Sequence, residues 1–193
     1  MLGFSQALDV DENRVFVGEA RNMHSPGRVY VYDREDGSWT ETTYLEADDG
    51  SVGDGFGAAL DGAGSTLAIG APSANAVYVF ERGEGGWTQA ARVTAPDSTA
   101  RLGSSVALSG DHLFVSTDAT LTMTDSDTTS TAAVHVFARQ SDGSWSESAV
   151  LRGSQISGGG DFGASLVASE SHLLVSAPKH RGGAVVAFQQ GDE

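Results

Sequence analysis

The chain has 193 residues, of which 39% are hydrophobic, and its 11 basic and 26 acidic side chains give a formal net charge of −15. This hydrophobic content supports a folded core and excludes a wholly disordered chain. The acidic excess argues against nucleic-acid binding, which needs clustered Lys and Arg. We find no run of about 18 apolar residues that could span a membrane, and the absence of cysteine excludes disulfides and zinc–thiolate sites.

Taken in chain order, four similar segments follow one another. Each opens with a large apolar residue and a glycine, followed by small and apolar residues. Small side chains are expected in a strand that lies close to neighbouring strands. A short polar turn and a second apolar run come next, then a third apolar run, and a Gly-rich turn leads to a fourth element headed by tryptophan. The opening pairs are Leu2-Gly3, Phe56-Gly57, Leu102-Gly103 and Phe162-Gly163.

The later elements of each segment repeat in the same register. The second runs cover residues 15–18, 67–70, 113–116 and 173–176, and the third runs cover 29–32, 77–80, 134–137 and 185–188. The tryptophans are Trp39, Trp87 and Trp145, and the chain reaches Glu193 without a fourth. Short β-branched and aromatic runs bounded by Gly, Asp, Asn and Ser are typical of strands and hairpins.

These patterns predict an all-β protein: a β-propeller built from four blade-like, four-stranded antiparallel repeats, the last lacking its outer strand. The repeats run over residues 2–55, 56–101, 102–161 and 162–193 and form a single domain over 1–193. We expect the strands of small residues to lie innermost. The tryptophan strands should lie outermost, with each ring packed on the neighbouring blade.

The opening pairs and a second motif resemble the FG-GAP repeat, the blade unit of integrin α-subunit propellers and of many bacterial and archaeal surface proteins. The second segment has Phe56-Gly57 and Gly70-Ala71-Pro72, and the fourth has Phe162-Gly163 and Ser176-Ala177-Pro178. The first and third segments depart from the second motif. The linker over residues 47–57 resembles the prokaryotic subtype. The resemblance implies a propeller that binds proteins at a cell surface.

Family members commonly hold calcium in the turn between the first two strands, where Ca²⁺ takes carboxylate and carbonyl oxygens. In the first segment Asp9, Asp11 and Asn13 match the first three ligand positions. Arg14 stands where the family has glycine, however, and Val17 stands where it has the closing carboxylate. We therefore favour a hydrogen-bonded turn and expect no cofactor, with a degenerate calcium site at these three residues as the alternative.

Two loops are candidate binding sites on the rim. His180 and Arg181 form a small basic tip on an acidic chain, which could contact a partner or an anion. Asp125 and Asp127 lie in the long insertion over residues 117–131, where propellers often bind. For the basic tip we favour a solvated loop over a binding site. The insertion has the composition of a flexible loop, and we favour that interpretation over contact at the rim. We find no catalytic motif, so we expect the protein not to be an enzyme.

Four blades are at the lower limit for a closed propeller, and no spare N-terminal strand is available to complete the fourth repeat. We therefore expect an incomplete ring that belongs to a larger propeller or self-associates through its open edge blades; a self-closed ring is the alternative. The expected function is a non-enzymatic protein-interaction or structural module. It would be a subunit or segment of a cell-surface or virus-particle assembly, with a calcium-dependent, integrin-like adhesion propeller as the alternative.

The expected location is extracellular, at a cell surface or in a virus particle, although the first residues show no signal peptide. Only Lys179 among the basic residues is a lysine. Scarce lysine and an acidic excess resemble proteins of salt-loving organisms, and an ordinary acidic surface is the equally weighted alternative.

Overall fold

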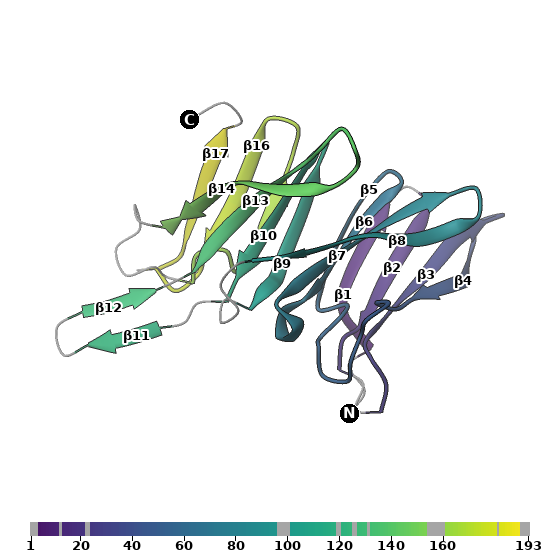
Figure 1. The fold of residues 1–193 in the computed structure, drawn as a ribbon, viewed down its shortest axis with the longest axis horizontal. Helices are drawn as coiled ribbons and strands as arrows, with labels where there is room; N and C mark the ends of the chain where they lie inside the picture. Colours follow the sequence, from purple (N-terminus) through teal and green to yellow (C-terminus); the bar gives the residue numbers. More distant parts are fainter. Residues whose placement is uncertain are drawn as a thin grey trace.

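The computed structural model describes residues 4–11, 13–21, 24–95, 101–118, 121–124, 127–130, 132–153, 161–180 and 182–189. Four antiparallel sheets follow one another along the long axis of the molecule as the blades of a β-propeller (Figure 1). The first three sheets have four strands and the last has three. The all-β propeller expected from the repeats is therefore confirmed, including the absence of an outer strand from the last sheet in the described chain.

The blades use the predicted apolar runs as strands. Blade 1 consists of β1 (Phe4–Asp11), β2 (Arg14–Glu19), β3 (Arg28–Glu35) and β4 (Ser38–Leu45). Blade 2 consists of β5 (Ala59–Ala63), β6 (Thr66–Ala71), β7 (Ala76–Gly83) and β8 (Gly86–Thr94), with the 3₁₀ turn η1 (Pro72–Ala74) after β6. Blade 3 consists of β9 (Leu102–Ser109), β10 (His112–Thr117), β13 (Ala133–Arg139) and β14 (Trp145–Arg152). Blade 4 consists of β15 (Leu166–Ala168), β16 (His172–Ala177) and β17 (Ala184–Gln189).

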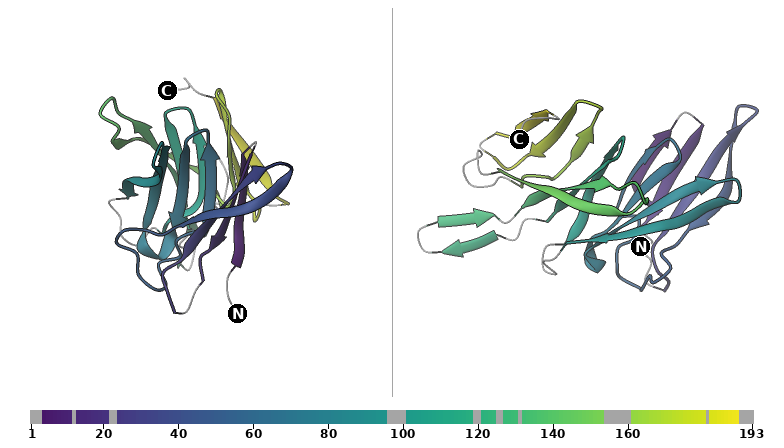
Figure 2. Two further views of the ribbon diagram at one scale, coloured as in Figure 1. Left: turned by 90° about the vertical axis from the view of Figure 1, so that its right-hand side faces the viewer. Right: turned by 45° about the horizontal axis from the view of Figure 1, so that its top comes forward.

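The first strand of each blade contacts the first strand of the next. In this way β1 packs against β5, β5 against β9, and β9 against β15. The strands of small residues thus lie innermost, as expected, because neighbouring blades approach most closely there. The four blades form a row, and blades 1 and 4 stand at its opposite ends (Figures 1 and 2).

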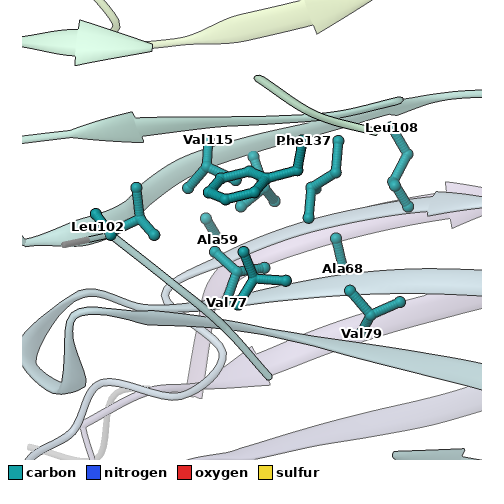
Figure 3. Packing of buried hydrophobic residues seen from close by; sticks show 12 residues of the cluster. Ala59, Ala68, Val77, Val79, Leu102, Leu108, Val115 and Phe137 are labelled. Carbon is teal, nitrogen blue, oxygen red and sulfur yellow. The ribbon is translucent and has the colours of Figure 1, made fainter. Parts of the chain in front are cut away.

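Each junction between blades encloses a hydrophobic cluster built from both partners. Figure 3 shows the cluster between blades 2 and 3, where Val77 and Val79 of β7 face Val115 of β10 and Phe137 of β13. These side chains are buried. Side chains alternate across a strand, so β7 also supplies Tyr78 and Phe80 to the cluster with blade 1. Blade 2 is therefore covered on both faces.

The tryptophan strand is outermost in blades 1, 2 and 3, as expected. In blade 2 the ring of Trp87 reaches the neighbouring blade, where it meets Phe16 edge-on with ring centroids 5.6 Å apart and planes at 84°. Trp145 of blade 3 packs against the cluster shared with blade 2. Trp39 of blade 1 has no preceding blade in the described chain and is 45% exposed.

The long insertion of blade 3 differs from the expected flexible loop. Its backbone forms a two-stranded hairpin of β11 (Leu121–Thr124) and β12 (Asp127–Ser130), in which Thr124 pairs with Asp127. The hairpin extends away from the four sheets (Figures 1 and 2). Its threonines explain the difference, because β-branched residues favour extended backbone.

Among the residues that the structure describes, no helix is long and apolar enough to cross a membrane.

Candidate functional site

The two repeat motifs meet at the junctions between blades. A Cβ atom at Gly18 would lie 2.1 Å from the carbonyl oxygen of Gly57, and one at Gly70 would lie 2.2 Å from that of Gly103. Gly57 and Gly103 are the glycines of the opening pairs and have φ angles of +91° and +101°. The opening glycine of one blade therefore touches the second-strand glycine of the preceding blade, and only glycine permits this backbone approach.

The junction between blades 3 and 4 is built differently. Ser116 takes the place of Gly18 and Gly70, and its Cβ lies 3.0 Å from where a Cβ would stand on Gly163. The serine is buried. Room for a side chain shows that the backbones of blades 3 and 4 are less closely apposed here than those of the other two junctions.

An aspartate on the innermost strand links each of the first two junctions. The Oδ2 atom of Asp9 accepts a hydrogen bond from the backbone N–H of Gly62 at 2.7 Å, and Asp61 Oδ2 accepts one from Leu108 at 2.5 Å. Burial raises the pKa of both carboxyl groups, that of Asp61 to about 6, although the backbone hydrogen bonds act in the opposite direction. At the third junction Ala107 occupies this position, opposite Phe114 of β10.

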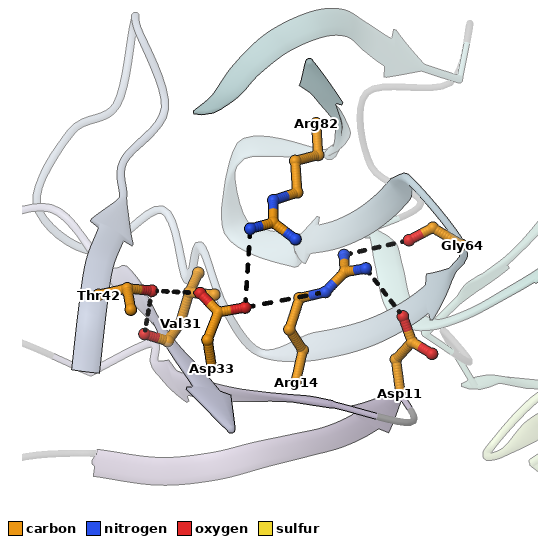
Figure 4. Close-up of polar contacts among 7 residues, drawn as sticks. All are labelled: Asp11, Arg14, Val31, Asp33, Thr42, Gly64 and Arg82. Carbon is orange, nitrogen blue, oxygen red and sulfur yellow. Dashed lines mark hydrogen bonds and ion pairs between the residues drawn. The ribbon is translucent and has the colours of Figure 1, made fainter. Parts of the chain in front are cut away.

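Charged side chains add a second connection between blades 1 and 2 (Figure 4). Arg14 donates to the carbonyl oxygen of Gly64 at 3.1 Å and lies 5.7 Å from the ring centre of Trp87. Asp33 lies between two guanidinium groups, 4.0 Å from Arg14 and 3.8 Å from Arg82 of blade 2. The turns of this junction are therefore held by ion pairs and hydrogen bonds within the chain.

Two of the three candidate calcium ligands, Asp9 and Asp11, bind other groups of the chain through their carboxylates. Asp9 points into the junction with blade 2, and Asp11 pairs with Arg14 at 3.4 Å. Asn13 lies in the turn, where its carbonyl oxygen accepts from the N–H of Arg34 at 2.9 Å. Within the described residues, no group of three or more His, Cys, Asp or Glu side chains is placed to hold a metal ion. A calcium site at this turn stays the alternative to the hydrogen-bonded turn that we expect.

The two candidate rim residues that the structure describes, His180 and Asp127, belong to different blades. His180 follows β16, and its N–H donates to the carbonyl oxygen of Ala177 at 3.2 Å. Arg181 and Asp125 fall outside the described residues, and Asp127 is the first residue of β12 in the extended hairpin. Their role in binding stays a prediction.

A polar cleft of about 370 Å³ lies beside the junction of blades 3 and 4. Lys179 and Asp161 form an ion pair at its wall, with the Nζ atom 2.6 Å from Oδ2. Asp118 also lines it and pairs with Arg101 at 3.1 Å. Paired charges on exposed side chains contribute little to stability, and we assign no ligand to this cleft.

Blade 1 presents an exposed apolar face to solvent, on the side where a preceding blade would pack. Leu8 and Val10 of β1 are 63% and 69% exposed, whereas Asp9 between them points toward blade 2. Phe4 meets Tyr30 edge-on at 5.5 Å, and Tyr30 lies 6.4 Å from Tyr44. We name this surface the blade-1 end face; its exposed members are Phe4, Leu8, Val10, Trp39 and Tyr44.

Blade 4 presents a second exposed apolar face, on the side where a following blade would pack. Its strands alternate, with Leu173 and Val175 of β16 buried against blade 3 and Leu174 between them 42% exposed. Val167 of β15 and Val185 of β17 are 62% and 67% exposed. We name this surface the blade-4 end face; its members are Val167, Leu174, Val185 and Ala187.

The sequence led us to expect binding through the open edge blades, but it did not lead us to the residues of either end face, although a signal was available. The run 185–188 is apolar at every position, and a strand with two apolar faces is typical of burial on both sides. The two junction aspartates gave a comparable signal, since Asp9 and Asp61 hold the same repeat position. Both patterns become informative once the repeats are aligned strand by strand.

Comparisons with known proteins support the repeat assignment. The FG-GAP repeat pattern matches residues 39–80, which include Trp39, the Phe56-Gly57 opening pair of blade 2 and its Gly-Ala-Pro motif. No curated protein sequence matches the chain. Among solved structures, a Lactobacillus plantarum protein is similar with a TM-score of 0.59 and 20% identity, over 95% of this chain and 53% of that one.

A second similar chain comes from a Saccharomyces cerevisiae complex of Dbp5 bound to Nup159, Gle1, IP6 and ADP. It has a TM-score of 0.51 and 12% identity, over 95% of this chain and 49% of that one. At these identities the likeness concerns the fold alone. The chain described here spans about half the length of both matched chains.

Proposed function

We propose, on the premise that this chain is an FG-GAP repeat β-propeller, that it is a non-enzymatic protein-interaction or structural module. It would serve as a subunit or segment of a cell-surface or virus-particle assembly. The observation that carries this proposal is the pair of apolar end faces, which stand at opposite ends of the molecule. Large contiguous apolar patches on a folded protein mark interaction sites.

The composition of the end faces also supports protein binding. Aromatic side chains are enriched at protein interfaces because they bury a large area and lose few rotamers. The blade-1 end face exposes Phe4, Trp39 and Tyr44. Against this, the first-blade carboxylates suited to an ion already bind within the chain, so the calcium-dependent alternative has less support.

Photocrosslinking tests this proposal in the organism that makes the protein. A photoreactive amino acid would replace Tyr44 on the blade-1 end face or Val185 on the blade-4 end face. The matched control position is Val52, an apolar side chain that is 55% exposed outside both faces. We expect protein adducts from both end-face positions and far fewer from the control position. Adducts that are no more abundant at the end faces than at Val52 would contradict the proposal.

A further inference from the structure

The repeat register places the two halves of one junction on the two end faces. In the junction of blades 1 and 2, Phe16 of β2 receives the ring of Trp87. Strand pairing puts Phe16 opposite Asp9 and Leu174 opposite Val167, so Leu174 holds the position of Phe16 in blade 4. Trp39 holds the position of Trp87 in blade 1. Leu174 and Trp39, which hold the positions of this ring contact, are both exposed.

The inner strands repeat the same relation. Leu60 of β5 pairs with Ile69 and packs in the cluster that blade 2 shares with blade 1. Leu8 pairs with Val17 at the equivalent place in blade 1, but it is exposed. The blade-1 end face therefore carries the residues that, in an internal junction, pack against the preceding blade. The blade-4 end face carries the residues that, in an internal junction, pack against the following blade.

We propose that the partner is a second copy of this chain, and that two copies close a ring of eight blades. This proposal rests on the proposed function, in which the end faces bind protein. In the dimer, blade 4 of each copy packs on blade 1 of the other, and a two-fold axis relates the two identical junctions. Trp39 of one copy then covers Leu174 of the other, as Trp87 covers Phe16 within the chain.

The number of copies follows from the size of propellers. Propeller rings typically contain four to eight blades. One copy leaves both end faces exposed, and three copies would bring about twelve blades, beyond this range. Two copies give eight, which is within the range and covers every end face. A head-to-tail contact that closes in this way forms a finite ring rather than a fibre.

Two charged groups at the blade-1 end face, Arg28 and Glu19, already have partners within the chain. Arg28 and Glu46 form an ion pair at 2.6 Å, and the Arg28 guanidinium lies 4.6 Å from the ring centre of Tyr44. Buried Glu19 accepts a hydrogen bond from the Tyr30 hydroxyl at 2.9 Å. An interface over these residues would therefore avoid the large cost of an unpaired buried charge.

The net charge of −15 on each copy opposes association through long-range repulsion. Salt screens this repulsion, since the Debye length falls from about 8 Å at 0.15 M to about 3 Å at 1 M. Apolar contacts between the end faces do not weaken in the same way. The dimer should consequently be tighter at high salt than at low salt.

Light scattering on the purified chain over a range of concentrations, at about 0.15 M and about 1 M salt, tests the proposal. We expect a mass twice the chain mass of 19.9 kDa, with a dissociation constant at least tenfold lower at high salt. Leu8→Asp and Leu174→Asp should each give monomers, because each substitution damages both junctions of its own dimer. Val52→Asp is the control and should dimerise like the unchanged chain.

Mixing the two end-face variants distinguishes head-to-tail pairing from other arrangements. A mixed dimer has one junction with both residues intact, so Leu8→Asp and Leu174→Asp together should regain a dimer that is weaker than wild type. Both side chains are exposed in the single chain, so thermal unfolding of the monomers should match that of the Val52→Asp monomer at low concentration.

Four results would overturn the proposal. A wild-type chain that stays monomeric at both salts would show that blades from another polypeptide or a longer chain cover the faces. Loss of the dimer in Leu174→Asp but not in Leu8→Asp would indicate pairing of two blade-4 end faces. Failure of the mixture to associate would exclude the head-to-tail ring. A monomer that still forms end-face adducts in the organism would contradict the dimer and leave the proposed function standing.

Discussion

Blade 2 and blade 4 carry similar apolar runs in their second and third strands. Neighbouring blades cover both faces of blade 2 but only one face of blade 4. In blade 2 every residue from Ala76 to Phe80 is buried, because blades 1 and 3 pack on its two sides. In blade 4 only alternate residues of β16 and β17 are shielded. The comparison shows that the sequence of a propeller blade specifies two contacts, and that blade 4 makes one of them within this chain.

The junctions on either side of blade 3 repeat this contrast on a smaller scale. Between blades 2 and 3, Gly70 touches Gly103, and Asp61 links to the N–H of Leu108. Between blades 3 and 4, Ser116 and Ala107 hold the equivalent positions. The junction of blades 2 and 3 has backbone contact and a buried carboxylate. The junction of blades 3 and 4 has room for a side chain at the position of Gly70. Substitutions at equivalent positions should therefore have unequal effects.

The largest effect should come from Gly70→Ala. A methyl group there would stand 2.2 Å from the carbonyl oxygen of Gly103, which is backbone and cannot rotate away. We expect the free energy of unfolding to fall by about 3 kcal/mol or more, as for severe overpacking. Urea unfolding measures it. Gly85→Ala is the control, since its methyl group meets nothing within 4 Å and should change stability by less than about 0.5 kcal/mol.

If Gly70→Ala were as mild as Gly85→Ala, blades 2 and 3 would not be in the close backbone contact described here. Ser116→Gly sharpens the comparison, because the junction of blades 3 and 4 already accommodates a side chain. That variant should lose some stability through added backbone freedom, about 1 kcal/mol or less, and should gain no closer contact.

Truncation of two equivalent tryptophans should give the next largest effect. Trp87→Ala removes the contact with Phe16 and the Arg14 guanidinium, and we expect it to cost about 2 kcal/mol of unfolding free energy. Trp39→Ala removes a ring that is 45% exposed and should cost less than about 1 kcal/mol in the monomer. Chemical unfolding at low protein concentration measures both. Equal costs would mean that Trp39 is buried against something in the isolated chain.

The repeats made the fold predictable because each blade is a local unit whose strands pair with their sequence neighbours. The opening pairs, the apolar runs and the tryptophans placed the sheets, and the packing of Trp87 on the neighbouring blade followed from them. The hairpin over β11 and β12 was missed because its threonine-rich composition suits both a loop and a strand.

The contacts between blades were harder to predict than the blades themselves. The carboxylate of Asp61 accepts a hydrogen bond from a backbone N–H 47 residues away, a contact that no local pattern in the sequence indicates. Strand periodicity tells which side of a sheet a residue occupies and not which atom of the next sheet it meets. The open edge blades were expected to associate, but their exposed residues were not identified for the same reason, since exposure of Leu174 depends on which neighbour blade 4 lacks.

The pH dependence of stability should show the smallest effect, through Asp61. Burial raises the pKa of this carboxyl group from 3.8 to about 6 in the folded protein. Between these values the folded state keeps a proton that the unfolded chain has released, so this contribution to stability is complete below about pH 4 and is lost as pH rises through about 6. Asp61→Asn removes this titration, and its amide oxygen can still accept from Leu108.

We therefore expect Asp61→Asn to gain stability relative to the unchanged chain between pH 4 and pH 7.5, by about 1.5 kcal/mol after allowance for partial solvent screening. Denaturant unfolding of both proteins across this range measures the difference. Asp142→Asn is the control, because hydrogen bonds from Ser144 lower the pKa of that exposed carboxyl, which gives a dependence of opposite sign. Parallel pH curves for Asp61→Asn and the unchanged chain would show that Asp61 is solvated, and blades 2 and 3 would then be joined by apolar packing and backbone contact alone.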